Sequence, residues 1–129
     1  MIKYREGYKY QLAESVSTQT SVFPKTDIVS EYITLLRNGL LIIEEGYAWD
    51  GCSGPTWDDK TNMQGGLVHD ALCQLMRMGL LEAKFRKAVD LVLYKQCVCD
   101  GMNKLRAWIY LKGVALSKSC SAVTSEPYP

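Results

Sequence analysis

Histidine is the scarcest chemically versatile residue in this sequence, because the 129 residues contain only His69. This excludes phosphohydrolases that hold their metal ions with several His and Asp side chains. A zinc site is also disfavoured, since it would have to be assembled from scattered thiols. Cys97 and Cys99, with one residue between them, lack the two-residue gap of a zinc or redox pair.

The chain also lacks a long apolar run and a strong charge of either sign. No stretch approaches the about 18 apolar residues of a membrane span, and residues 1–11 do not resemble a signal peptide. Lys and Arg number 15 against 14 Asp and Glu, a net charge of +1, so no nucleic-acid partner is expected. The five cysteines form an odd set without a secretion signal, which predicts reduced thiols inside a cell.

What the chain does have is the composition of a globular protein. Hydrophobic residues make up 47% and charged residues 22%, which is typical of a packed core and not of a disordered chain. A chain of this length is the size of one domain. We predict a single α+β domain over residues 1–118 and a loose C-terminal tail over 119–129.

The N-terminal third is predicted to be β. The aromatic-rich segment 8–13 predicts a strand. Segments 31–36 and 40–44 flank Asn38-Gly39, which predicts an antiparallel hairpin with a type I′ turn. Residues 18–25, which include a proline, are expected to form a connecting loop.

A glycine-rich loop and about three helices are predicted to follow. The stretch 46–66 contains five glycines and is expected to be irregular. Helical spacing of apolar residues then predicts helices from Gln64 to near Gly79, over 82–100 and over 103–117. The third helix presents as its apolar residues Leu105, Trp108, Ile109, Leu111 and Leu116.

His69 lies at the head of the apolar stripe of the first predicted helix, so its ring is expected to face inward and to need polar partners. Asp90 follows 21 positions later on the second helix. A short turn between antiparallel helices would bring the two residues opposite each other. A carboxylate on one ring nitrogen leaves the other nitrogen to accept a proton from water, which is a general-base dyad. Asp100 is a second candidate partner, and an Asp90–Arg86 ion pair is the structural alternative.

The loop before this helix suggests a site for a hard cation such as Ca²⁺. Asp70 points about 100° away from His69 around the helix, toward the entering loop. Glycines in that loop can turn backbone carbonyls inward, and calcium prefers several carboxylate and carbonyl oxygens. The predicted metal ligands are Asp70, Asp50, Gly51 and Gly54. Trp49, Ser53 and Trp57 are predicted to form a binding loop, although such tryptophans also commonly pin a loop to the core.

Two resemblances arise from these residues. The order Asp50-Gly-x-Ser53-x-Pro55, Val68-His69-Asp70 and Arg86-x-Ala88-x-Asp90 resembles an uncharacterised domain family of tailed phages and prophages, domain of unknown function 1353. This resemblance implies a phage protein, located in the host cytoplasm or the virion, without specifying an activity.

The second resemblance is to the His-Asp core of phospholipases A2, which carry a glycine-rich calcium loop, a His-Asp helix and a second aspartate on an antiparallel helix. It implies that His69 is the base, Asp90 its partner and Asp70 a calcium ligand. We therefore predict a phage-encoded hydrolase-like site for an ester or phospholipid. The alternative is a non-enzymatic phage factor, either a virion or tail-assembly component or an inhibitor of a host or defence protein, that uses the same loop as a binding surface.

Overall fold

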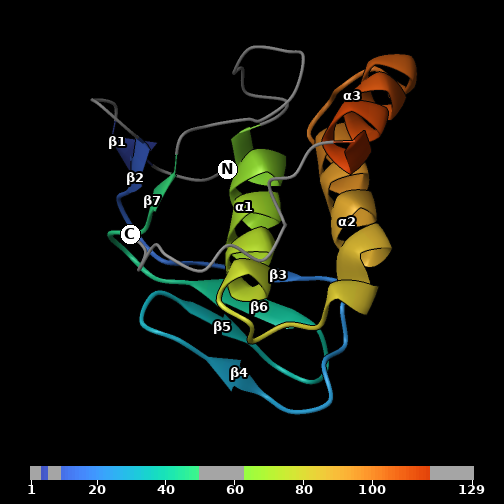
Figure 1. Cartoon of the computed structure of the whole chain (residues 1–129). Coiled ribbons are helices and arrows are strands. Elements are labelled where there is room, and N and C mark those ends of the chain that lie inside the picture. Colours follow the sequence, from blue (N-terminus) through green and yellow to red (C-terminus); the bar gives the residue numbers. More distant parts are fainter. Residues whose placement is uncertain (1–3, 6–9, 50–62, 117–129) are drawn as a thin grey trace.

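The computed structural model describes residues 4–5, 10–49 and 63–116 of the chain. Strands come first and helices follow, which confirms the predicted α+β class (Figure 1). The strands form two antiparallel sheets, with the orders β1-β2-β7 and β3-β6-β5-β4. The elements are β1 (Tyr4–Arg5), β2 (Tyr10–Leu12), β3 (Val16–Gln19), β4 (Ile28–Val29), β5 (Ile33–Leu35), β6 (Leu40–Ile43), β7 (Ala48–Trp49), α1 (Met63–Arg77), the 3₁₀ helix η1 (Ala83–Phe85), α2 (Arg86–Cys99) and α3 (Lys104–Leu116).

The hairpin predicted around Asn38-Gly39 is formed by β5 and β6, but its turn differs from the predicted type. The Gly39 amide donates to the Leu36 carbonyl, and the Leu36 amide donates to the Leu40 carbonyl. Gly39 has a φ of 89°, whereas no described residue other than glycine has a positive φ. The connection is therefore a type I turn closed by a glycine bulge, and the type I′ prediction is wrong. Glycine is needed here, since an added Cβ would lie 2.4 Å from the Thr20 carbonyl oxygen.

The segment 18–25 is not entirely a loop, because its first two residues belong to strand β3. Thr18 pairs with Leu41 and Gln19 pairs with Leu40. The side chains of β3 alternate between half-buried and exposed, as they do on a sheet edge that meets solvent. Strand propensity depends on context, and this short element pairs with β6 along its whole length.

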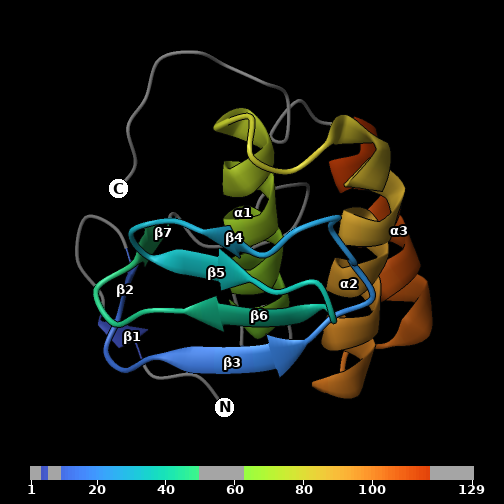
Figure 2. The ribbon, with the colours of Figure 1, turned by 90° about the horizontal axis from the view of Figure 1, so that it is seen from below.

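Helix α1 forms the centre of the molecule. It begins at Met63, so the end of the stretch predicted to be irregular is helical. It ends where Gly79 adopts a φ of 77° and the Leu80 and Gly79 amides donate to the Leu75 and Met76 carbonyls, which is a Schellman motif. Its apolar side chains join those of the four-stranded sheet in one core, and Figure 2 shows α1 behind that sheet.

Helix α3 packs on α2, on the side away from α1 (Figures 1 and 2). Ala107 and Tyr110 are buried in this contact, together with Leu93 and Cys97 of α2. The apolar face that the sequence presents on this helix is turned outward, because Leu105, Trp108 and Ile109 are all exposed. None of the helices within residues 63–116 is long and apolar enough to cross a membrane.

Candidate active site

The predicted contact between His69 and Asp90 is present between α1 and α2. His69 Nε2 lies 2.7 Å from Asp90 Oδ1, and the two side chains are only 3% and 6% exposed. A carboxylate accepts hydrogen bonds, so in the neutral ring the proton resides on Nε2 and Nδ1 carries the lone pair. The structure also decides between the two candidate aspartates, since Asp100 accepts a hydrogen bond from Gln96 instead.

Arg86 completes the arrangement from one turn earlier on α2. Its Nε lies 3.3 Å from Asp90 Oδ1 and 3.2 Å from Oδ2. The ion pair that the sequence offers as an alternative to the dyad therefore coexists with it. Because Asp90 is held from both sides, its carboxylate is charge-compensated, and a buried carboxylate without such partners would be strongly disfavoured.

The second ring nitrogen of His69 faces a cysteine on its own helix. Cys73 Sγ lies 3.6 Å from Nδ1, at the i+4 position where side chains of a helix meet. Cys73 is disulfide-bonded, so its sulfur has no proton to donate to Nδ1. This finding corrects the expectation of reduced thiols for Cys73, whereas Cys97 and Cys99 are in the thiol form.

The close approach of α1 and α2 has a local cause in the sequence. A Cβ placed on Gly65 would lie 2.9 Å from Cys97 Sγ and 3.0 Å from Leu93 Cδ1. The absence of a side chain at this position lets the two helices come together one turn before His69. The short connection from Gly79 to η1 then returns α2 alongside α1, which brings Asp90 opposite His69.

The predicted metal site lies mostly outside the described residues. Asp70 is half-buried on α1, whereas Asp50, Gly51 and Gly54 are not within the described ranges. Among the residues that the structure describes, no group of three His, Cys, Asp or Glu side chains could hold a metal ion. Calcium usually takes six to eight oxygens, so Asp70 would have to share the ion with several groups of the loop.

The predicted binding loop also lies mostly outside the described residues. Trp49 ends strand β7, where its backbone pairs with Tyr10 of β2, and its side chain is not described. Ser53 and Trp57 lie outside the described residues, so their roles stay predictions. The strand that carries Trp49 shows that the chain enters this loop from the three-stranded sheet.

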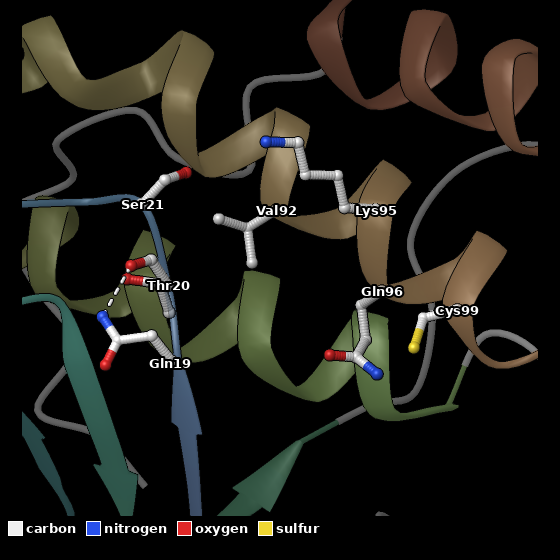
Figure 3. Close-up of a pocket in the computed structure, with 7 residues that line it drawn as sticks. All are labelled: Gln19, Thr20, Ser21, Val92, Lys95, Gln96 and Cys99. Atoms are coloured by element: carbon white, nitrogen blue, oxygen red, sulfur yellow. Dashed lines mark hydrogen bonds between the residues drawn. The ribbon is translucent and has the colours of Figure 1, made fainter.

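A separate cavity of about 350 Å³ lies between the end of β3 and α2 (Figure 3). None of the predicted site residues lines it. Gln19 is fixed at its edge because its Nε2 donates to the carbonyls of Thr20 and Asn38. No sequence pattern indicates this cavity, because its walls come from two segments that are distant in the chain. The lining residues are Gln19, Thr20, Ser21, Val92, Lys95, Gln96 and Cys99.

Comparison of the chain with protein-family models, curated proteins and solved structures gives no match. The resemblances to the phage family and to phospholipases A2 therefore stay predictions. Any function assigned to the chain has to be argued from the geometry of the site itself.

Proposed function

We propose that the chain is a small phage-encoded hydrolase in which His69 is a general base for the attack of water on an ester or phospholipid. The observation that carries the proposal is the Nε2–Asp90 contact of 2.7 Å. It fixes the ring and its tautomer, leaving the Nδ1 lone pair as the proton acceptor. Nδ1 has no nitrogen or oxygen partner among the described residues.

The reaction would proceed through proton transfers at Nδ1. Water gives a proton to Nδ1 as its oxygen bonds to the ester carbonyl carbon. The tetrahedral intermediate then collapses, the bond to the leaving alkoxide breaks, and Nδ1 returns the proton to that oxygen. Asp90 stabilises the positive charge that the ring carries between these two transfers, and Arg86 holds the carboxylate in position.

Calcium is part of this proposal as a bound ion that would polarise the ester carbonyl. Asp70 is the described residue that would contribute to holding it, and the predicted loop ligands Asp50, Gly51 and Gly54 would supply further oxygens. A calcium ion bound only by the folded chain would raise its melting temperature, and a chelator would reverse the increase.

The second candidate function is a non-enzymatic phage protein, and the burial of the dyad favours it. His69 and Asp90 are each more than nine-tenths buried, as is usual for a polar pair that holds two helices in register. In that case the chain would act by binding a host, defence or virion protein through its surface.

The test is turnover of a panel of carboxylic esters and phospholipids, each measured with calcium and with chelator. The unmutated chain should hydrolyse at least one substrate, and His69→Gln should lower kcat by about 10²–10⁴-fold, the usual contribution of a general base. Asp100→Asn is the matched control and should leave kcat unchanged. Absence of turnover by the unmutated chain would favour the non-enzymatic function, whereas full activity of His69→Gln would rule out His69 as the general base.

A further inference from the structure

The outward face of α3 combines exposed apolar side chains with positive charge. Leu105, Trp108 and Ile109 are 66%, 50% and 50% exposed, and their spacing places them side by side on one face of the helix. Lys104 and Lys112 are also exposed on this helix. We call this set of five residues the α3 face.

The opposite side of the helix already has its packing partner. Ala107 and Tyr110 are buried against α2, so the α3 face is not needed to hold α3 in place. Large apolar side chains gathered in one exposed patch are unusual on a soluble surface and typically mark a contact site.

The charge of α3 restricts the kind of partner. The helix contains three basic residues, Lys104, Arg106 and Lys112, and no Asp or Glu, although the whole chain carries a net charge of only +1. The partner should therefore be anionic. A second copy of the chain, joined through the same face by twofold symmetry, would place like charges together.

The composition of the face matches an anionic lipid surface. Tryptophan prefers the boundary between headgroups and hydrocarbon, where its ring is apolar and its N–H remains in a polar layer. Lys112 Nζ lies 5.3 Å from the centre of the Trp108 ring, so the charge and the ring would reach the interface together. Lysines at the two ends of an apolar ridge can extend toward headgroups while their methylenes stay near the ridge.

We propose that the chain docks peripherally on anionic membranes through the α3 face, with Leu105, Trp108 and Ile109 inserted at the headgroup boundary. This is the arrangement of interfacial amphipathic helices, which lie in the membrane surface. The docking does not depend on the proposed hydrolysis, since no residue of the α3 face belongs to the dyad.

The experiment is sedimentation of the full chain with vesicles of phosphatidylglycerol and phosphatidylcholine, compared with phosphatidylcholine alone. Binding is expected to the anionic vesicles and to weaken as salt rises. Lys104→Glu with Lys112→Glu should reduce the partition coefficient by about tenfold or more, and Leu105→Ser with Ile109→Ser should reduce it to a similar degree. Tryptophan emission of the unmutated chain should shift to the blue on binding, and Trp108→Phe should abolish the shift, since the chain also contains Trp49 and Trp57.

Matched controls carry the same changes on the β-sheet side. Val29 is 72% exposed on β4 and Lys25 is exposed nearby, so Val29→Ser and Lys25→Glu should leave vesicle binding unchanged. The proposal is wrong if the unmutated chain binds neither vesicle type or if the controls lose binding equally. It is also wrong if the α3 variants change only the oligomeric state, because the occupant of the face is then a second copy.

Discussion

Helices α1 and α3 are of similar length and both are rich in apolar residues, yet they occupy opposite environments. Twelve of the fifteen residues of α1 are buried, since the sheet covers one side of it and α2 another. Helix α3 contacts α2 through Ala107 and Tyr110 and leaves Leu105, Trp108 and Ile109 exposed. Apolar content alone therefore does not locate the core. The burial of a helix depends on how many other elements pack around it.

The largest expected effect is at the polar contact that joins α1 to α2. Asp90→Ala would leave His69 buried without its carboxylate and Arg86 without its ion-pair partner, and should lower the free energy of unfolding by about 3–5 kcal/mol. The measurement is urea denaturation. The control is Glu82→Ala, which removes a surface pair with Lys84 whose side chains are 57% and 61% exposed, and should change stability by at most about 1 kcal/mol. Equal effects of the two substitutions would contradict the assigned role of the dyad.

A smaller effect is expected at the close contact between the same two helices. Gly65→Ala would place a Cβ 2.9 Å from Cys97 Sγ and 3.0 Å from Leu93 Cδ1. Overpacking costs about 1–3 kcal/mol and the higher helix propensity of alanine offsets about 1 kcal/mol of it, so the unfolding free energy should fall by up to about 2 kcal/mol. Gln64→Ala, at the preceding position, adds no atoms and serves as the control. A stabilised Gly65→Ala variant would mean that α1 and α2 lie further apart than described.

The smallest expected effect is on the outer face of α3. Ile109→Ala should change the unfolding free energy by no more than about 0.5 kcal/mol, because its side chain is 50% exposed and is not part of the buried cluster between α2 and α3. Tyr110→Ala on the inner face, where the side chain is 2% exposed, should be much more destabilising. A reversal of the two effects would show that α3 is rotated by half a turn and that its predicted apolar residues do face the core.

Much of the candidate site could be predicted, because the sequence positions of its residues follow the periodicity of helices. His69 lies on a regular apolar stripe, and the distance in sequence to Asp90 suits two antiparallel helices joined by a short turn. Arg86 and Cys73 lie at i−4 from Asp90 and i+4 from His69, so the same periodicity contains the signal for both contacts. The sequence could not establish that Arg86 and His69 contact Asp90 at the same time. The Arg86–Asp90 ion pair within α2 and the His69–Asp90 contact between helices are alternatives in the sequence, and the structure contains both.

The predictions that failed depended on contacts between distant segments. A polar edge strand, β3, exists because β6 offers it a backbone ladder, and strand propensity depends strongly on such context. The turn at Asn38-Gly39 contacts Thr20, which is distant in sequence: the Thr20 amide donates to the Gly39 carbonyl, and the Thr20 carbonyl leaves no room for a Cβ at Gly39. The disulfide of Cys73 was likewise not predicted from the sequence.

The succession of strands and then helices and the glycine-terminated helix ends could be read from the sequence, because each depends on local geometry and periodicity. The sequence limited the partner of His69 to Asp90 or Asp100, and the contact between α1 and α2 selected Asp90. Which apolar side of α3 is buried depends on how this helix packs against α2. Both sides of that helix are apolar, so local preference is nearly balanced, and the small side chain of Ala107 allows close packing on α2. The outward orientation of Trp108 is the consequence, and it rests on packing that no local pattern encodes.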